Sequence, residues 1–375
     1  MRVGILSYPM LFQRDGRLQA QVRATIQALN RIALMPGRGP VEAELVDPLR
    51  SRLDDYDLVH VFAAINGNHR IVEAAVELDV PVVLSALIAP GWNRADGRRA
   101  RIADRLLGNL IGWGVQSSYA QTRDALQLAS LVLAQGPAEK QAMRNAFLVD
   151  PDKVRVMPNG IGPHFFAADA QLFRARTGLQ GEFALMAGPV SPYRNQIEMA
   201  QALHEIALPL VVMGEARERD AGYLRQLRAA PGVICMGTPR HAERMMASAC
   251  AAASVFVLPG RGDDLAPAAL EALAAGTPVL AGAECALELP NSEFALKKAR
   301  WDDVRAQKRA LLAILEAAPA PERVRALVRQ FSWDSVALQL NDCYLDVAES
   351  FRRRLPQAPW LGQGPCPSSE SYTAR

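Results

Sequence analysis

The chain has 375 residues, a formal net charge of +3 and a hydrophobic fraction of 50%. This length exceeds what one hydrophobic core usually serves, so we expect two domains. The small net charge gives no indication of nucleic-acid binding. Five scattered cysteines without metal-ligand spacing indicate a reduced protein. The first residues lead directly into a predicted strand and lack the features of a signal peptide, so we expect a cytoplasmic location.

The first part of the chain alternates between predicted strands and helices. One helix carries Leu18, Val22, Ile26 and Leu29 on a single face and follows a loop that contains Gly16. Other helices are expected over 69–78 and 102–111 and from residue 137 onward. Short apolar runs predict strands at residues 3–6, 42–46, 58–62, 82–88, 131–134 and 154–157.

The second part repeats this alternation after a polar connection. Strands are predicted at residues 183–187, 208–213, 233–236, 254–258 and 278–281, and a long amphipathic helix is predicted at 332–354. We therefore expect a first domain at 1–165, a second at 166–330, a helix at 331–355 that closes the fold, and a disordered tail at 356–375. Two doubly wound parallel sheets in tandem predict a ligand cleft between the carboxyl ends of their strands.

Asp263 and Glu271 flank the turn between a predicted strand and a helix. The helix has Pro267 in its first turn and ends before Gly276. Free N–H groups at a helix start attract phosphate, and Glu271 is placed to accept hydrogen bonds from sugar hydroxyls. The alternatives are that Asp263 only caps the helix and that Glu271 only faces solvent. The pattern predicts a site for a nucleotide-linked sugar.

A second loop supports this prediction. The strand at 183–187 ends at Gly188, and a short loop then leads to Arg194 and a further helix. A guanidinium group at this position suits the oxygens of a diphosphate. The alternative is an exposed loop arginine without a ligand.

Taken together, these segments resemble the retaining glycosyltransferases of the GT-B fold, in the large family 4 group. Gly188 and Arg194 match the glycine and the lysine position of that family's G-R-x4-K loop. The run from Leu270 to Val279 matches its L-E-A-x-A-x-G-x-P-V segment without a gap. Residues 154–161 resemble its interdomain segment, and residues 331–333 resemble the start of its final helix.

The resemblance implies an α/β chain with GT-B architecture: two Rossmann-like, doubly wound domains that face a cleft, and a C-terminal crossover helix. It implies transfer of a sugar from a nucleotide diphosphate sugar with retention, without a metal or a separate cofactor. Arg194 would then neutralise the leaving diphosphate, Asp263 would face the donor sugar, and His60 would stand at a catalytic position. The alternative for His60, at the end of a predicted strand, is a buried imidazole that is hydrogen-bonded within the core. The residues implied in substrate binding are Gly16, Gly188, Asn195, Leu265, Ala266 and Glu271.

The sequence departs from the family pattern near the chemistry. Pro189 replaces the phosphate-binding arginine, Asp263 replaces a glutamate, and Phe62 stands where a histidine is common. Two alternatives therefore stay open. One is a catalytically impaired relative that binds a nucleotide sugar or acts as a scaffold. The other is a sugar-nucleotide epimerase, which would need more acid–base residues than the sequence offers.

The expected partners are the nucleotide-sugar donor and a glycan, lipid-linked or small-molecule acceptor. Arg94, Arg98, Arg101 and Arg105 recur at helical spacing. One interpretation is a basic face that contacts the inner surface of a membrane or a charged acceptor. The other is a solvated helix face. No nucleic-acid partner is expected.

Overall fold

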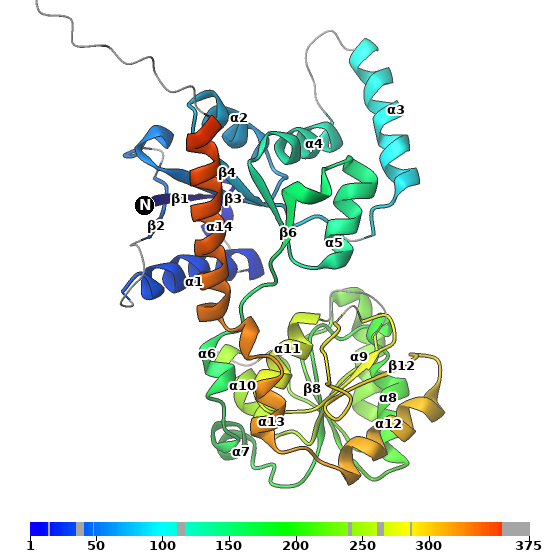
Figure 1. The fold of residues 1–375 in the computed structure, drawn as a ribbon. Helices are drawn as coiled ribbons and strands as arrows, with labels where there is room; N and C mark the ends of the chain where they lie inside the picture. The colour runs from blue at the N-terminus through cyan, green and yellow to red at the C-terminus, as the bar shows by residue number, and fades with distance from the viewer. Residues whose placement is uncertain are drawn as a thin grey trace, which may run out of the picture.

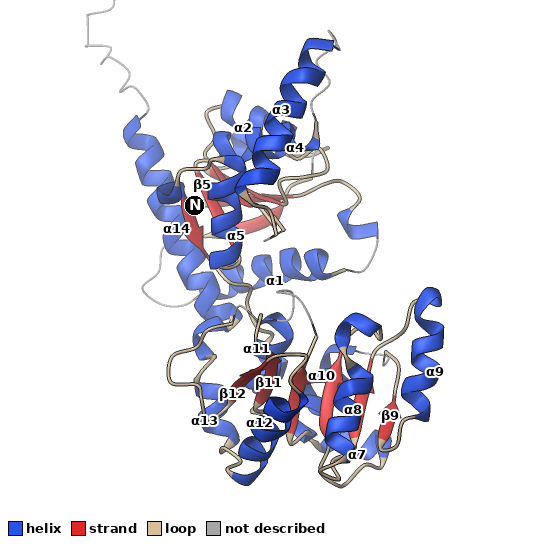
Figure 2. Cartoon of the chain, turned by 90° about the vertical axis from the view of Figure 1, so that its right-hand side faces the viewer, coloured by secondary structure: helices blue, strands red, loops and turns tan. Residues whose placement is uncertain are grey.

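The computed structural model describes residues 1–13, 16–34, 41–47, 49–89, 91–110, 117–238, 242–260, 266–285 and 287–354. Two domains lie one above the other, and the last helix runs along the first domain (Figure 1). Each domain has a sheet enclosed between helices (Figure 2).

The first domain contains a six-stranded parallel sheet with the order β2-β1-β3-β4-β5-β6. Its strands are β1 Arg2–Leu6, β2 Glu42–Leu45, β3 Leu58–Phe62, β4 Val82–Ser85, β5 Leu131–Ala134 and β6 Val154–Val156. Every residue of β3 and β4 is buried. Strands buried on both faces read as continuous apolar runs, which explains why these two were predictable.

Helices cover both faces of this sheet. On one face α1 (Arg17–Ile32) packs beside α14 (Trp333–Arg354), which returns from the far end of the chain. On the other face lie α2 (His69–Glu77), α4 (Ser118–Leu128) and α5 (Pro137–Ala142), followed by a π-helical turn at Met143–Phe147. The helix α3 (Arg94–Leu110) extends away from the sheet (Figure 1).

The second domain repeats the architecture. Its parallel sheet has the order β12-β11-β10-β7-β8-β9. The strands are β7 Ala184–Ala187, β8 Leu210–Met213, β9 Val233–Cys235, β10 Val255–Leu258, β11 Val279–Gly282 and β12 Leu296–Ala299. One face packs against α6 (Pro163–Phe166), α7 (Gln171–Thr177), α10 (Ala242–Ala252), α11 (Ala266–Ala274) and α13 (Pro321–Ala326). The other packs against α8 (Gln196–His204), α9 (Ala221–Ala229) and α12 (Val304–Glu316).

The chain crosses twice between the domains, and the two crossings are bonded to each other. The amide of Ile161 donates to the carbonyl of Phe331 at 2.7 Å, and the amide of Trp333 donates to the carbonyl of Ile161 at 3.3 Å. A Cβ on Gly160 would lie 2.3 Å from the ring of Trp333, so only glycine fits there. α1 lies on the side of the first domain that faces the second domain, and α11 lies on the side of the second domain that faces the first (Figures 1 and 2).

The expected elements are present, with differences at their ends. β4 ends at Ser85 and not at residue 88, because Leu87 adopts a left-handed conformation with φ 55°. α3 begins eight residues before the predicted start. β12 was not expected, and Ile161 and Phe165 pack into the second core a few residues before the predicted domain boundary. The predicted tail at 356–375 lies outside the described residues.

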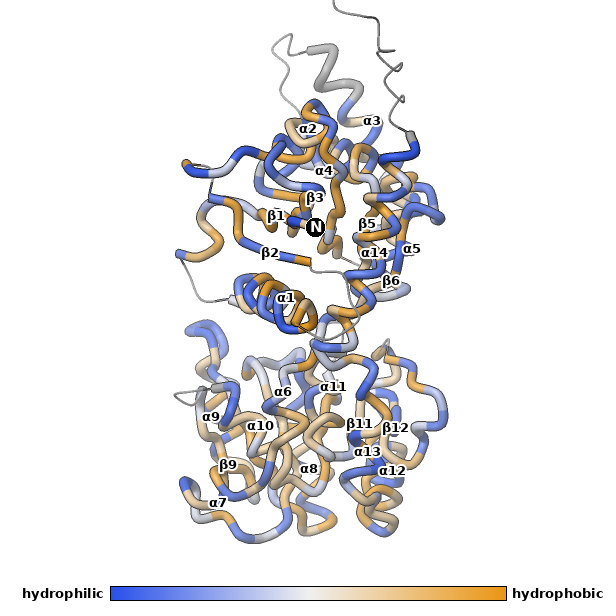
Figure 3. Tube along the Cα trace, turned by 60° about the vertical axis from the view of Figure 1, so that its left-hand side comes forward, coloured by the Kyte–Doolittle hydropathy of each residue, from blue (hydrophilic) through white to orange (hydrophobic). Residues whose placement is uncertain are grey.

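The hydrophobic pattern accounts for this arrangement. α1 alternates between hydrophobic and hydrophilic residues along its turns, as expected for a helix with one buried face (Figure 3). Val22 and Leu29 of α1 and Tyr344 of α14 are fully buried in the same core. The C-terminal helix therefore belongs to the first domain by packing, although it follows the second in sequence.

Candidate active site

The second sheet reverses its strand order between β7 and β10. From β7 the chain proceeds to β8 and β9 on one side, and then returns to place β10 on the other side of β7. The connections after β7 and β10 therefore leave in opposite directions at the carboxyl ends of these strands. Doubly wound sheets bind their ligands at such a position. Arg194 follows β7, and Asp263 and Glu271 follow β10.

Glycines line the backbone at this edge of the sheet. Gly188 ends β7 with φ 117°, a conformation that side chains disfavour. A Cβ on Gly214, after β8, would lie 1.8 Å from the carbonyl oxygen of Gly188. A Cβ on Gly282, at the end of β11, would lie 3.0 Å from the carbonyl oxygen of Gly260. The strand ends thus approach one another without intervening side chains.

The loop after β7 places Arg194 over the end of β10. Residues Pro192–Arg194 form a short 3₁₀ turn, and Asn195 then adopts a left-handed conformation that starts α8. The side chain of Asn195 is buried and donates from Nδ2 to the carbonyl of Pro259 at 3.1 Å. A Cβ on Gly260 would lie 3.2 Å from Cδ of Arg194. The structure thus brings together Gly188, Arg194 and Asn195 with the first residues after β10.

Pro189 lies exposed beside this loop. Its carbonyl accepts a hydrogen bond from Nε2 of Gln196 at 3.1 Å, which ties the start of the loop to α8. Tyr193 is 71% exposed next to Arg194. The exposed position of Pro189 means that an arginine there would project from the same strand end as Arg194.

Glu271 lies half-buried in α11, about one and a half turns from the helix start. Burial raises the pKa of the Cys250 thiol on α10, and the nearby charge of Glu271 raises it further. Asp263 and Leu265 lie outside the described residues, and Ala266 is the first residue of α11. The roles of these four residues toward a substrate stay predictions.

His60 is held in the core of the first domain. It is 1% exposed, with Nδ1 at 2.7 Å from the Tyr344 hydroxyl and Nε2 at 2.9 Å from the Ser85 hydroxyl. Its ring stacks on Phe62 with centroids 4.2 Å apart. Burial lowers the pKa of His60 to about 3, so the imidazole is neutral at physiological pH. This geometry favours a role in joining β3, β4 and α14, and a catalytic role stays a prediction.

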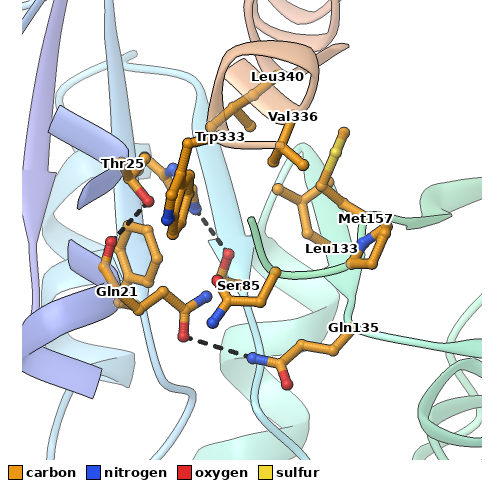
Figure 4. Close-up of a pocket in the computed structure, with 13 residues that line it drawn as sticks. Gln21, Thr25, Ser85, Leu133, Gln135, Met157, Trp333, Val336 and Leu340 are labelled. Carbon is orange, nitrogen blue, oxygen red and sulfur yellow. Dashed lines mark hydrogen bonds between the residues drawn. The ribbon is translucent and has the colours of Figure 1, made fainter. Parts of the chain in front are cut away.

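A cavity of about 30 Å³ lies beside His60, where α1, α14 and the first interdomain crossing meet (Figure 4). Polar groups line it, among them Gln21, Thr25 and Gln135. In the close-up Gln135 Nε2 donates to Oε1 of Gln21 at 3.4 Å, and the Thr25 hydroxyl donates to the backbone carbonyl of Gln21 at 2.9 Å. A cavity of this size holds a water molecule but not a sugar ring. A substrate therefore cannot reach His60 through it in this conformation.

Gly16 precedes α1 at the corresponding edge of the first sheet. It is exposed, its backbone is extended with φ −170°, and a Cβ there would meet nothing within 4 Å. The start of α1 has no side-chain cap from this residue. The open space fits the predicted approach of a phosphate, but the backbone conformation does not require glycine.

The basic residues of α3 do not form one free face. Arg101 donates to the carbonyl of Ala146 at 2.7 Å and to the hydroxyl of Tyr119 at 3.1 Å. A Cβ on Gly97 would lie 2.3 Å from the carbonyl oxygen of Ala146, so this side of α3 packs against the π-helical turn. Arg101 is therefore a structural donor, and the interpretation of the four arginines as one membrane-facing or solvated face is wrong for it. Arg98 is exposed, and the side chain of Arg105 lies outside the described part.

Other features of the described residues do not compete with this site. A surface depression of about 380 Å³ lies against the edge strand β12, which β11 and β10 separate from β7, and is lined by residues such as Leu287, Glu293 and Lys297. Within the described ranges, no three His, Cys, Asp or Glu side chains cluster as metal ligands would. The predicted independence of metal stays a prediction. Among the same residues no helix is both long and apolar enough to cross a membrane.

Gly214 and Gly260 were not identified from the sequence as part of the site. Both follow apolar strand runs directly, at Met213 and Pro259, and this position was the available signal. A Cβ on Gly214 would meet Gly188, which follows β7, and a Cβ on Gly260 would meet Arg194 in the loop after β7. Their role therefore depends on which strands are neighbours in the sheet.

Part of the second domain is similar to a known family. Residues 184–316 match the family Glycosyl transferases group 1. The chain is 26% identical over 339 residues to the D-inositol 3-phosphate glycosyltransferase of Streptomyces coelicolor, covering 80% of this chain and 71% of that protein.

Solved structures share the whole fold. Anabaena HepE in complex with UDP superimposes with a TM-score of 0.61 at 17% identity, over 92% of this chain and 100% of that one. A sucrose-phosphate synthase from Thermosynechococcus elongatus superimposes with a TM-score of 0.63 at 18% identity, over 93% and 99%. The predicted two-domain α/β architecture of the GT-B type is confirmed.

Proposed function

We propose that this chain, which has the GT-B fold and matches the glycosyl transferases of group 1 over residues 184–316, is a retaining, metal-independent glycosyltransferase. Its donor is a nucleotide diphosphate sugar bound at the carboxyl ends of β7 and β10. The family match and the glycosyltransferase relatives support the transferase activity. The neighbour bound to UDP supports a nucleotide-linked donor. The acceptor is a glycan, a lipid-linked sugar or a small molecule.

The observation that carries this proposal is the position of Arg194 at the switch point of the second sheet, which is the place between β7 and β10 where the strand order reverses. Arg194, whose Cδ lies beside Gly260, offers a positive charge to a diphosphate as it leaves the sugar. Asp263 faces the donor sugar and Glu271 holds the ribose hydroxyls. The protein acts in the cytoplasm, with the acceptor bound mainly by the first domain.

A panel of UDP-, GDP- and ADP-sugars tests the proposal, with release of the nucleoside diphosphate as the signal. We expect turnover with at least one donor and a loss of about tenfold to a hundredfold in Glu271→Ala, since that change removes charge-assisted hydrogen bonds. Glu198→Ala is the matched control, because Glu198 is an exposed helix residue on α8. If the two substitutions have equal effects, Glu271 does not take part in binding the donor.

The second candidate is a relative that binds a nucleotide sugar without transferring it. Two observations favour it: Pro189 offers no cation at the strand end, and His60 is enclosed in the core. This candidate predicts donor binding by calorimetry without release of nucleoside diphosphate at any acceptor concentration. Turnover by the wild-type protein excludes it.

A further inference from the structure

The helix α8 begins directly after Arg194, and the residue at its start does not cap it. Asn195 occupies the N-cap position, but its side chain bonds to the carbonyl of Pro259 instead of to an amide of α8. The first amides of a helix have no acceptor within the helix itself. The side chain at the N-cap normally accepts from the second or third of them. At the start of α8 this acceptor has to come from elsewhere.

Tyr223, on the neighbouring helix α9, supplies it. Its hydroxyl accepts a hydrogen bond from the amide of Ile197, the second residue of α8, at 3.1 Å. The ring of Tyr223 is half-buried and packs, like Ile197, against the core on this face of the second sheet. Burial is the main cause that raises the pKa of Tyr223, so the hydroxyl is uncharged at neutral pH. The bond ties the start of α8 to α9.

Two further hydrogen bonds make this tie part of a closed set. Nε2 of Gln196, the first residue of α8, donates to the carbonyl of Pro189 at 3.1 Å. The amide of Val190 donates to the carbonyl of Glu215 at 2.9 Å, so the loop after β7 runs beside the loop after β8. The loop after β8 leads into α9, which carries Tyr223. The chain between β7 and α8 is therefore held at its start by the loop after β8 and at its end by Tyr223.

We propose that Tyr223 is a positioning residue for the donor site of the proposed transferase: its hydroxyl holds the start of α8 and thereby holds Arg194 in place. Asn195 fixes the same turn to the end of β10, so the turn is anchored toward β10 and toward α9. Tyr223 acts through Arg194 and does not itself touch the donor. The inference rests on the proposed function for the word donor, and the first of its two tests needs no ligand.

Hydrogen–deuterium exchange of the full chain, measured by mass spectrometry, is the test without ligand. Tyr223→Phe removes the hydroxyl and keeps the ring. We expect peptides from residues 189–198 to exchange about threefold to tenfold faster in this variant, because the start of α8 opens more often. Tyr56→Phe is the matched control, since it removes a tyrosine hydroxyl that donates to Glu44 at 3.0 Å in the first domain. Unchanged exchange of residues 189–198 in Tyr223→Phe would overturn the inference.

Calorimetric titration with UDP, GDP and ADP is the second test, on the wild type, Tyr223→Phe, Arg194→Ala and the double variant. We expect Tyr223→Phe to weaken the tightest-binding nucleotide about threefold to fivefold in the wild-type background. The same change should have no effect in the Arg194→Ala background, because the two residues act as a unit. A merely structural role would weaken binding equally in both backgrounds, and that result would overturn the inference.

The titrations also separate the inference from the proposed function. If none of the three nucleotides binds the wild type, the proposed function fails and the inference fails with it. If a nucleotide binds the wild type and Tyr223→Phe equally well, the proposed function stands and the inference alone is overturned.

Discussion

Asn195 donates from Nδ2 to the carbonyl oxygen of Pro259 at 3.1 Å. This bond joins the connection after β7 to the connection after β10, on either side of the switch point of the second sheet. Asn195 adopts φ 53°, a left-handed conformation that asparagine tolerates better than most residues. The bond fixes the loop after β7 against the end of β10, and Arg194 is the residue immediately before it. The position of the cation is therefore set by the backbone of both connections.

Gly260→Ala should disturb this arrangement. The new Cβ would lie 3.2 Å from Cδ of Arg194 and 3.2 Å from the carbonyl oxygen of Tyr193, so Arg194 must move by a few tenths of an ångström. We expect affinity for a nucleoside diphosphate, measured by calorimetry, to fall about fivefold to tenfold, in line with the usual cost of overpacking.

The matched control is Gly222→Ala. Gly222 lies in α9, and a Cβ there meets nothing within 4 Å. Alanine should therefore stabilise the helix by about 0.5–1 kcal/mol and leave nucleotide affinity unchanged. If Gly260→Ala binds as the wild type does, Arg194 is not held in place by this contact.

Pro189→Arg should restore a second cation at the end of β7. Pro189 is exposed, and as a proline it donates no backbone hydrogen bond that the change could break. A charge-assisted hydrogen bond contributes about 1.5–3 kcal/mol, so affinity for a nucleoside diphosphate should rise about tenfold or more at low salt. The gain should shrink as salt is added. An unchanged or weaker affinity would show that a diphosphate does not lie in front of Pro189.

His60 should make the protein less stable in acid. Its pKa falls from 6.5 to about 3 on burial, so its contribution to stability is complete above pH 6.5 and is lost as pH falls toward 3. The slope for one such group is at most about 1.4 kcal/mol per pH unit.

His60→Gln tests this dependence. We expect the variant to be less stable than the wild type at pH 8, because the bonds to Tyr344 and Ser85 are disturbed. The difference in unfolding free energy, measured with urea, should narrow between pH 6.5 and 4. A difference that stays constant over this range would mean that folding does not lower the pKa of His60.

Strand positions and the order of the two domains followed from the sequence because strands buried on both faces are continuous apolar runs. β12 did not follow, since Lys297 and Lys298 make this edge strand look like a surface segment. The end of β4 depends on the backbone angle of Leu87, which no local pattern reveals.

The candidate site was predictable in part for a similar reason. Gly188, Arg194 and Glu271 stand out by spacing along the chain, and Gly260 becomes relevant only when β10 is placed beside β7. The surroundings of His60 depend on Tyr344, 284 residues later in the sequence, which reaches it only because α14 returns to the first domain. Contacts between segments so far apart are not encoded in any local pattern.

The most direct test of the account is calorimetric titration with UDP, GDP and ADP of the wild type, Arg194→Ala and Arg176→Ala. Arg176 is an exposed arginine on α7 in the same domain and serves as the control for lost charge. We expect at least one nucleoside diphosphate to bind the wild type and the control equally, and to bind Arg194→Ala about tenfold or more weakly. Absence of binding by all three nucleotides, or equal binding by the two variants, would contradict a diphosphate site at the switch point.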